Sequence, residues 1–306
     1  MKINKKNTEK IEGGKRMKFG TLYAYWGNEW KCDYREIAER VKGIGFDILE
    51  VGADHLTKMS NAQLDELKAV SKDLDLILTA NIGPAKDKDV ASADPQIREA
   101  GIAYLTSIMK AMDRIDSRSI VGVMYSYWPC DFQDVDKPAA WDRGVQSVKR
   151  LCKVAEDLGI EYCMEVVNRF ETFILNTAAE GVQYCKDVDS KACKLLMDTF
   201  HMNIEEDNIA DGFRTAGDYL GHIHVGEGNR RLPGQGHLPW DEIGKALREI
   251  HYDKGVVMEP FVLPGGGVGR DIKVWRDLSE GADEAKLTAD MKESLQFLKK
   301  KFLGAG

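Results

Sequence analysis

Four short apolar segments of this chain each carry one ionisable residue near their end. These residues are Glu165 in "YCMEVVN" (162–168), Asp198 in "CKLLMDTFH" (193–201), His224 in "LGHIHVGE" (220–227) and Glu259 in "GVVMEPFV" (255–262). Segments of this kind pack inside proteins, where an ionised side chain is costly unless an opposite charge neutralises it. The three carboxylates and the imidazole therefore need a common explanation.

A divalent cation would supply that explanation. Successive residues of this set lie roughly 30 residues apart, which is the length of one βα unit. If the four segments are neighbouring strands of a barrel, their side chains meet at the C-terminal mouth, where barrel enzymes have their active sites. Oxygen-rich ligation with one imidazole suits Mn²⁺, Mg²⁺ or Co²⁺. We therefore predict that Glu165, Asp198, His224 and Glu259 bind one divalent cation.

Taken alone, a Glu or His in the middle of a strand is more often an internal polar group satisfied by hydrogen bonds. Four such residues at successive strand ends favour the metal site over that reading. The side chains of His222 and His224 should lie on the same face of their strand, because side chains alternate with a period of two. It lies deeper, so we predict that it supports the site or belongs to the core.

The rest of the chain predicts the scaffold for these residues. Eight apolar, β-branched runs alternate with amphipathic helical patterns, and their continuous hydrophobicity suits parallel strands buried on both faces. The runs are 19–26, 46–53, 76–83, 119–128, 160–168, 193–201, 220–227 and 255–262. Eight βα units predict an α/β fold, a single (β/α)8 TIM barrel over residues 17–306. A doubly wound open sheet would carry a Gly-rich fingerprint after the first strand, and "YAYWGNEW" is not one.

Local signals support the intervening helices. Ser60 and Gln63 have capping-box spacing, and Asp94-Pro95 can open a helix. The long segment after the eighth run, 263–283, is a predicted loop with a Gly-rich stretch at 265–269. That stretch is either a phosphate-binding turn or, as we favour, a flexible linker.

Composition excludes several classes of protein. The 306 residues have a formal net charge of −7, which argues against a broad nucleic-acid or anionic-membrane surface. No apolar run approaches the ~20 residues that span a bilayer. The six cysteines form no C-x-x-C pair, as expected for reduced thiols in the cytoplasm. Residues 1–16 are charged and lack a secretory core, so we predict a flexible extension.

Polar and aromatic residues follow the predicted strands and could line a pocket for a small polar ligand. The polar residues are Arg169, Glu171, His201, Asn203, Glu227 and Arg230, and the aromatic residues are Trp26, Trp30 and Trp128.

At "MEVVNRFE", "MDTFHMNIEED", "GHIHVGEGNRR" and "VMEPF", the sequence resembles the ketose 3-epimerases, specifically the D-psicose (D-allulose) and D-tagatose 3-epimerases. "YAYW", "YSYWP" and "DIKVWRDLS" support the resemblance, which covers residues 17–303. The resemblance implies that the four predicted ligands bind one Mn²⁺ or Co²⁺ per subunit. It also implies that Glu165 and Glu259 are the acid and base, that Glu171, His201 and Arg230 hold a ketose, and that the protein is a homodimer or homotetramer.

This chemistry agrees with the residues. Epimerising C3 of a ketose requires removal of a proton next to the C2 carbonyl and return of a proton to the opposite face. A metal on O2 and O3 stabilises the cis-enediolate, and two carboxylates exchange the protons. The sequence departs from the family at Leu22 and at Val121-Gly122-Val123, where Leu22 and Val123, with Trp30 and Trp128, are expected to line the pocket. The preference among D-fructose, D-tagatose and pentuloses therefore stays open.

Other functions remain alternatives. A xylose isomerase-like sugar isomerase would share the barrel and the metal but release an aldose. A pentulose-phosphate 3-epimerase would need a phosphate grip, for which the Gly-rich stretch is the candidate. A barrel endonuclease would need a basic DNA-binding face, which the acidic charge balance disfavours. A sugar-binding protein without turnover would need no paired glutamates.

Overall fold

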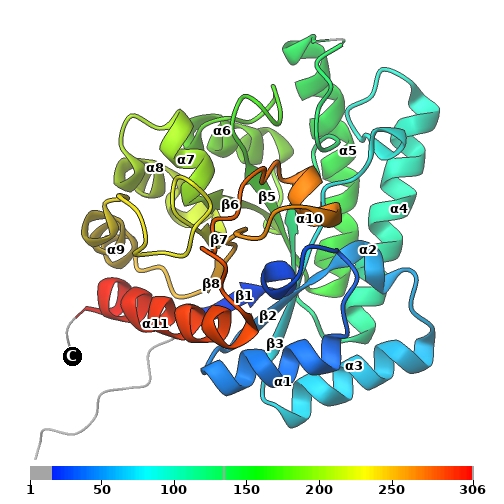
Figure 1. Cartoon of the computed structure of the whole chain (residues 1–306). Coiled ribbons are helices and arrows are strands. Elements are labelled where there is room, and N and C mark those ends of the chain that lie inside the picture. Colours follow the sequence, from blue (N-terminus) through cyan, green and yellow to red (C-terminus); the bar gives the residue numbers. More distant parts are fainter. Residues whose placement is uncertain (1–15, 134, 305–306) are drawn as a thin grey trace, which may run out of the picture.

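Eight parallel strands close into a barrel in the order of the chain, with β8 paired to β1 (Figure 1). The structure is a computed structural model, and it describes residues 16–133 and 135–304. The strands are β1 Lys18–Leu22, β2 Ile48–Gly52, β3 Ile77–Asn81, β4 Ser119–Gly122, β5 Glu161–Val166, β6 Cys193–Asp198, β7 Leu220–Val225 and β8 Gly255–Met258. Seven strands fall within the runs that the sequence predicts, and β1 begins one residue before its run of 19–26, so the (β/α)8 barrel is confirmed.

Helices surround the barrel on the outside (Figure 1). The α-helices are α1 Tyr34–Ile44, α2 Ala53–Leu56, α3 Asn61–Asp73, α4 Pro95–Arg114, α5 Lys137–Leu158, α6 Ala178–Val188, α7 Thr199–Glu205, α8 Ile209–Ala216, α9 Trp240–Glu249, α10 Gly266–Asp271 and α11 Glu284–Leu303; short 3-10 turns are η1 Tyr23–Trp26, η2 Lys86–Lys88 and η3 Gly217–Tyr219. Ser60 and Gln63 form the predicted capping box of α3, and Asp94 caps α4 directly before Pro95. Within the described residues, no helix is long and apolar enough to cross a membrane.

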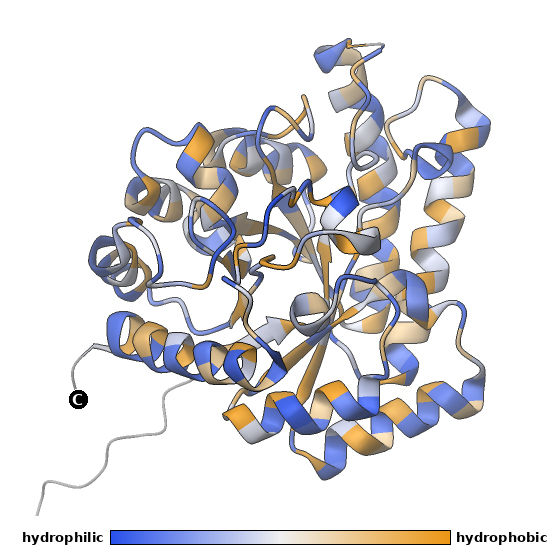
Figure 2. Ribbon diagram, in the orientation of Figure 1, coloured by the Kyte–Doolittle hydropathy of each residue, from blue (hydrophilic) through white to orange (hydrophobic). Residues whose placement is uncertain are grey.

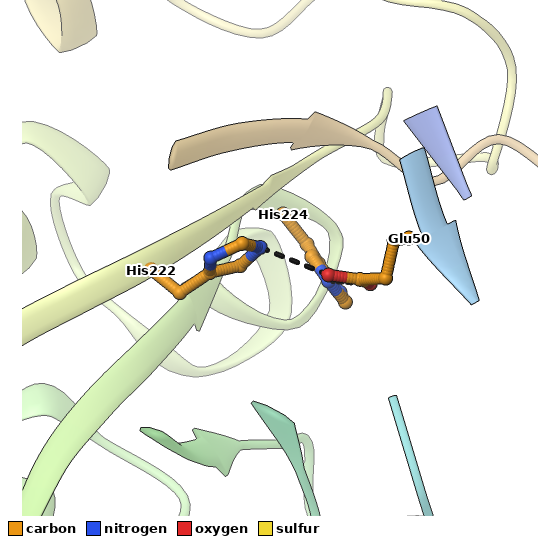
Figure 3. A group of neighbouring side chains, drawn as sticks. All are labelled: Glu50, His222 and His224. Atoms are coloured by element: carbon orange, nitrogen blue, oxygen red, sulfur yellow. Dashed lines mark hydrogen bonds and ion pairs between the residues drawn. The ribbon is translucent and has the colours of Figure 1, made fainter. Parts of the chain in front are cut away.

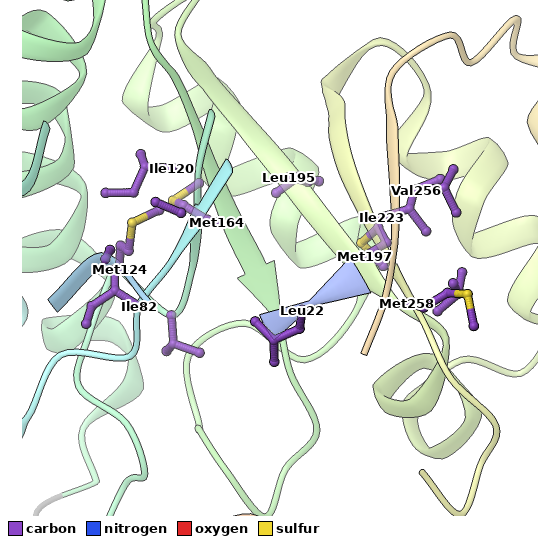
Figure 4. Packing of buried hydrophobic residues seen from close by; sticks show 14 of the residues in the cluster. Leu22, Ile82, Ile120, Met124, Met164, Leu195, Met197, Ile223, Val256 and Met258 are labelled. Carbon is purple, nitrogen blue, oxygen red and sulfur yellow. The ribbon is translucent and has the colours of Figure 1, made fainter. Parts of the chain in front are cut away.

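The strands separate an apolar outside from a partly polar inside. Figure 2 shows strands that are largely hydrophobic, while each surrounding helix mixes hydrophobic and hydrophilic residues. Met164 on β5, Leu195 on β6 and Ile223 on β7 belong to the main core between barrel and helices (Figure 4). The alternate residues point inward, where Val121, Cys163 and Leu196 form a small separate apolar cluster. The barrel interior above this cluster is therefore free to hold polar residues.

The Gly-rich stretch at 265–269 is not the flexible linker that we expected, because most of it forms α10. The Val268 amide donates to Asn28 O at 3.0 Å, which ties α10 to the segment after β1. Gly266 has a φ of 60°, and a Cβ atom there would lie 2.0 Å from Asn28 O. Only glycine fits this left-handed position and this close approach. The glycines therefore fix α10 in place beside the barrel mouth.

The predicted extension 1–16 lies outside the described residues except for Arg16, and it stays a prediction.

The loop between β7 and α9 is built around the buried carboxylate of Glu227, which is 1% exposed. It accepts hydrogen bonds from the Gly234 amide at 2.7 Å, the Leu238 amide at 3.2 Å and Trp240 Nε1 at 2.8 Å. Glu227 therefore has a structural role in this loop, which also carries Arg230, and it does not line the pocket as the sequence suggested.

Replacing Glu227 with Ala should lower the free energy of unfolding by about 3 kcal/mol, because it leaves three donors without an acceptor in a buried site. Chemical denaturation of the purified variant measures this loss. Glu242→Ala, an exposed change on α9, is the control and should stay within about 0.5 kcal/mol of the parent protein. An equal, small effect of both changes would contradict the structural role of Glu227.

Candidate active site and metal centre

Four side chains from neighbouring strands converge at the C-terminal end of the barrel. Ligand atoms of Glu165, Asp198, His224 and Glu259 all lie within 4.8 Å of one another, and the four residues are buried. Asp198 ends β6 and is paired in register with His224 on β7. The Glu259 amide follows β8 and donates to Val225 O at 3.0 Å. The ends of strands β5 to β8 thus bring together the four residues that the sequence predicts as ligands.

The pKa values of the carboxylates in this cluster are shifted in different directions. Burial raises the pKa of Glu165 well above its usual value, and the nearby Glu259 adds to the effect. Burial also opposes ionisation of Asp198, but the Arg230 guanidinium, His201 and His224 together with the Phe200 amide outweigh it and lower the Asp198 pKa. Arg230 Nη1 donates to Asp198 Oδ2 at 2.8 Å and to Glu259 Oε2 at 3.1 Å. One arginine therefore neutralises only part of the negative charge.

The residues present fit a divalent cation. His224 Nδ1 is buried and has no hydrogen-bond partner among the described residues. It lies 3.4 Å from Glu259 Oε1 and 3.8 Å from Glu165 Oε1. An unpartnered imidazole nitrogen that faces several carboxylate oxygens is the donor set that Mn²⁺ or Co²⁺ accepts. A cation here would satisfy the nitrogen and offset the excess negative charge.

A cavity of about 510 Å³ opens above the cluster. Glu165 and Glu259 line it, whereas Asp198 and His224 lie outside its lining. All the residues that we predicted for substrate contact also line it: Leu22, Trp30, Val123, Trp128, Glu171, His201 and Arg230. The cavity has space for a small polar ligand.

Other residues that the sequence placed near the pocket do not line it. Arg169 forms an ion pair with Glu205 at 2.8 Å. Trp26 Nε1 donates to the Thr288 hydroxyl at 3.1 Å. Asn203 is also absent from the cavity lining. Position after a strand therefore predicts the neighbourhood of a loop residue but not the direction of its side chain.

One wall of the cavity is a hydrogen-bonded group around Glu171. Its carboxylate accepts from Trp128 Nε1 at 2.6 Å and from Asn168 Nδ2 at 3.2 Å. Burial raises the Glu171 pKa, but His201 and Arg230, together with the hydrogen bonds from Trp128 and Asn168, outweigh this effect and lower the pKa overall. The Trp128 ring packs closely on Gly83, where a Cβ atom would lie 2.9 Å from Trp128 Cβ. Glu171 is thus a fixed, ionised acceptor at the edge of the cavity.

Arg230 is held in place from several sides. Its guanidinium lies 3.8 Å from the centre of the Phe200 ring, and a second ring, Phe261, lies at 5.5 Å. The backbone has a φ of 67°, which is uncommon for a residue other than glycine. The Arg230 amide donates to Glu227 O and its carbonyl accepts from the Phe261 amide, both at 2.9 Å. Such over-determined left-handed residues cluster at functional sites.

Two residues that the sequence did not single out also support the cluster: Glu50 on β2, which does not line the cavity, and Asn81 at the end of β3, which does. Glu50 is completely buried, and burial raises its pKa, but His224 and His222 outweigh this and keep the pKa well below its usual value. Asn81 Nδ2 donates to Glu259 Oε1 at 3.2 Å. Glu50 had the same sequence signal as Glu165, a carboxylate inside the apolar run "FDILEVGA".

Comparisons with known proteins agree with this geometry. Residues 38–301 match the family model "Xylose isomerase-like TIM barrel". A D-psicose 3-epimerase from Agrobacterium fabrum is 50% identical over 282 residues, covering 92% of this chain and 98% of the relative. A crystal structure of D-psicose 3-epimerase in the presence of D-fructose has a TM-score of 0.93 and 49% identity, covering 94% of this chain and 100% of that one. The enzyme from Clostridium cellulolyticum H10 with D-tagatose has a TM-score of 0.92 and 48% identity, covering 94% and 99%.

Saturating Mn²⁺ should raise the melting temperature of the chelator-treated protein, because a ligand that binds only the folded state stabilises it by about 2.7 kcal/mol at 100 times its Kd. Asp198→Asn and Glu165→Gln should abolish most of this shift, since each removes one charged ligand. Differential scanning calorimetry with and without Mn²⁺ measures it. An undiminished shift in both variants would place the cation elsewhere.

Proposed function

This chain belongs to the xylose isomerase-like TIM barrel family and, within it, to the ketose 3-epimerases, and we propose that it interconverts D-fructose and D-psicose in a metal-dependent reaction at C3. The observation that carries the proposal is the placement of two buried glutamates, Glu165 and Glu259, at the floor of one cavity and within one cluster of metal-ligating groups.

Glu165, Asp198, His224 and Glu259 would hold Mn²⁺ or Co²⁺. The bound cation would act as a Lewis acid toward the ketose oxygens and make the proton at C3 easier to remove. The excess of carboxylates over local cationic side chains supports this assignment, because Arg230 donates to Asp198 and Glu259 but forms no hydrogen bond with Glu165 among the described residues.

Two carboxylates can exchange protons with opposite faces of C3. In the forward direction, one glutamate removes the C3 proton and the other returns a proton to the opposite face, so that C3 is inverted. The roles reverse in the back reaction. Glu259 is fixed by hydrogen bonds from Asn81 and Arg230. Glu165 lies 3.6 Å from His201 Nε2 and 3.8 Å from His224 Nδ1, beyond hydrogen-bond distance.

Glu171, His201 and Arg230 would hold the reacting end of the sugar. His201 Nδ1 is engaged by the Asn168 side-chain amide at 2.8 Å, which leaves Nε2 facing the cluster and the substrate. The apolar side chains of Leu22, Val123 and Trp30 would contact the remaining carbons. D-tagatose differs from D-fructose only in the configuration at C4, so its C2 carbonyl and C3 proton are available for the same reaction. It is present with one of the similar enzymes, and we propose it as a second substrate.

The homodimer or homotetramer that the family resemblance implies stays a prediction.

Purified protein with Mn²⁺ should convert D-fructose to D-psicose, and chelation should remove the activity. Liquid chromatography of the sugars measures both. Glu165→Gln and Glu259→Gln should lower kcat by about 10³-fold or more, because each loses proton transfer as well as a ligand.

Exposed Glu242→Gln is the matched control and should retain full activity. Formation of an aldose from D-fructose would instead identify a sugar isomerase. Turnover of neither D-fructose nor D-tagatose would overturn the hexulose assignment.

A further inference from the structure

Glu50 lies in the middle of β2, inside the barrel, and faces two histidines of β7 (Figure 3). Its Oε1 lies 2.7 Å from His224 Nε2, and its Oε2 lies 3.0 Å from His222 Nε2. The Thr79 hydroxyl donates to Oε2 at 2.8 Å. Glu50, His224 and Thr79 are at most 4% exposed. Both carboxylate oxygens therefore have fixed partners away from water.

The two nitrogens of His224 face different surroundings. Nε2 contacts the Glu50 carboxylate, while Nδ1 faces the carboxylates of Glu165 and Glu259. Because the Glu50 oxygen accepts the hydrogen bond, the imidazole proton lies on Nε2. Nδ1 then has a free lone pair directed at the cluster, as a metal-bound histidine requires.

We propose that Glu50 is a positioning residue of the metal centre, which fixes the tautomer and the ring orientation of His224 and so sets the affinity of the site for the cation. This inference rests on the metal site of the proposed function. Thr79 and His222 hold Glu50 in turn, and none of these three residues lines the cavity. Glu50 therefore acts through His224 and not on the substrate.

Asn81 links Glu50 to Glu259, a second predicted ligand of the cation. Asn81 Nδ2 donates to Glu259 Oε1 at 3.2 Å and lies 3.5 Å from Glu50 Oε1. Strands β2 and β3 thereby brace two ligands that come from β7 and the end of β8. A second metal ion between Glu50, His222 and His224 is a poorer explanation, because the hydrogen bonds from Thr79 and His224 already occupy both Glu50 oxygens.

The test is a Co²⁺ titration of the chelator-treated protein, followed by the visible absorption of the bound ion. Bound Co²⁺ reports both the affinity and the geometry of its ligands, which a change in overall stability would not alter. Glu50→Gln should weaken binding by about 10-fold or more and change the spectrum. Thr79→Val, a smaller change that removes only one support of Glu50, should act in the same direction by a smaller factor.

Asp89→Asn is the matched control, since Asp89 is a buried carboxylate (8% exposed) outside the cavity lining that accepts from the Ala91 amide at 2.8 Å. It should leave the affinity and the spectrum unchanged. Wild-type affinity and spectrum in Glu50→Gln would overturn the inference while the metal site stands. If Glu50→Gln does not fold, an unchanged Thr79→Val would overturn it. Failure of the parent protein to bind Co²⁺ would overturn both the inference and the metal-dependent function.

Discussion

The burial of like charges inside the barrel is the constraint on which the site depends. Glu50, Glu165, Asp198 and Glu259 are each less than 9% exposed. Glu165, Asp198 and Glu259 form one cluster with His224, and His224 also contacts Glu50. Buried carboxylates cannot all stay ionised without compensation. Arg230 compensates two of them, and the histidines of β7 compensate Glu50. The nearest imidazole nitrogens lie 3.6 and 3.8 Å from Glu165 Oε1, and a divalent cation would supply the compensation that this carboxylate lacks.

The barrel can hold these charges because strand alternation separates them from the apolar core. Met164 and Leu195 pack outward against the helices, while Glu165 and Leu196 point inward on the same two strands. The stability of the fold therefore comes from the layer between strands and helices, and the interior is available for chemistry. Side chains held by paired strands move less than loop side chains, which suits a site where proton transfer requires fixed distances.

Much of this arrangement could be predicted from the sequence, since strand periodicity and βα spacing alone place Glu165, Asp198, His224 and Glu259 at one end of a barrel. The direction of loop side chains could not be predicted. Glu227 and Arg230 lie in the same loop after β7, yet Glu227 turns to the loop amides while Arg230 turns to the cluster. The carboxylate of Glu50 was visible inside an apolar run, but its contact with His224 was not, because the two residues are far apart in the sequence and meet only inside the closed barrel.

The most direct test of the two-carboxylate account is turnover of D-fructose in D₂O with Mn²⁺, followed by NMR of the sugars. Exchange of a proton at C3 through Glu165 and Glu259 predicts D-psicose that carries solvent deuterium at C3 and none at C1. Deuterium at C1, or unlabelled product from an internal hydride shift, would contradict the account. Deuterium at C1 would show reaction at a different carbon, and unlabelled D-psicose would show that C3 is inverted without the proposed proton exchange.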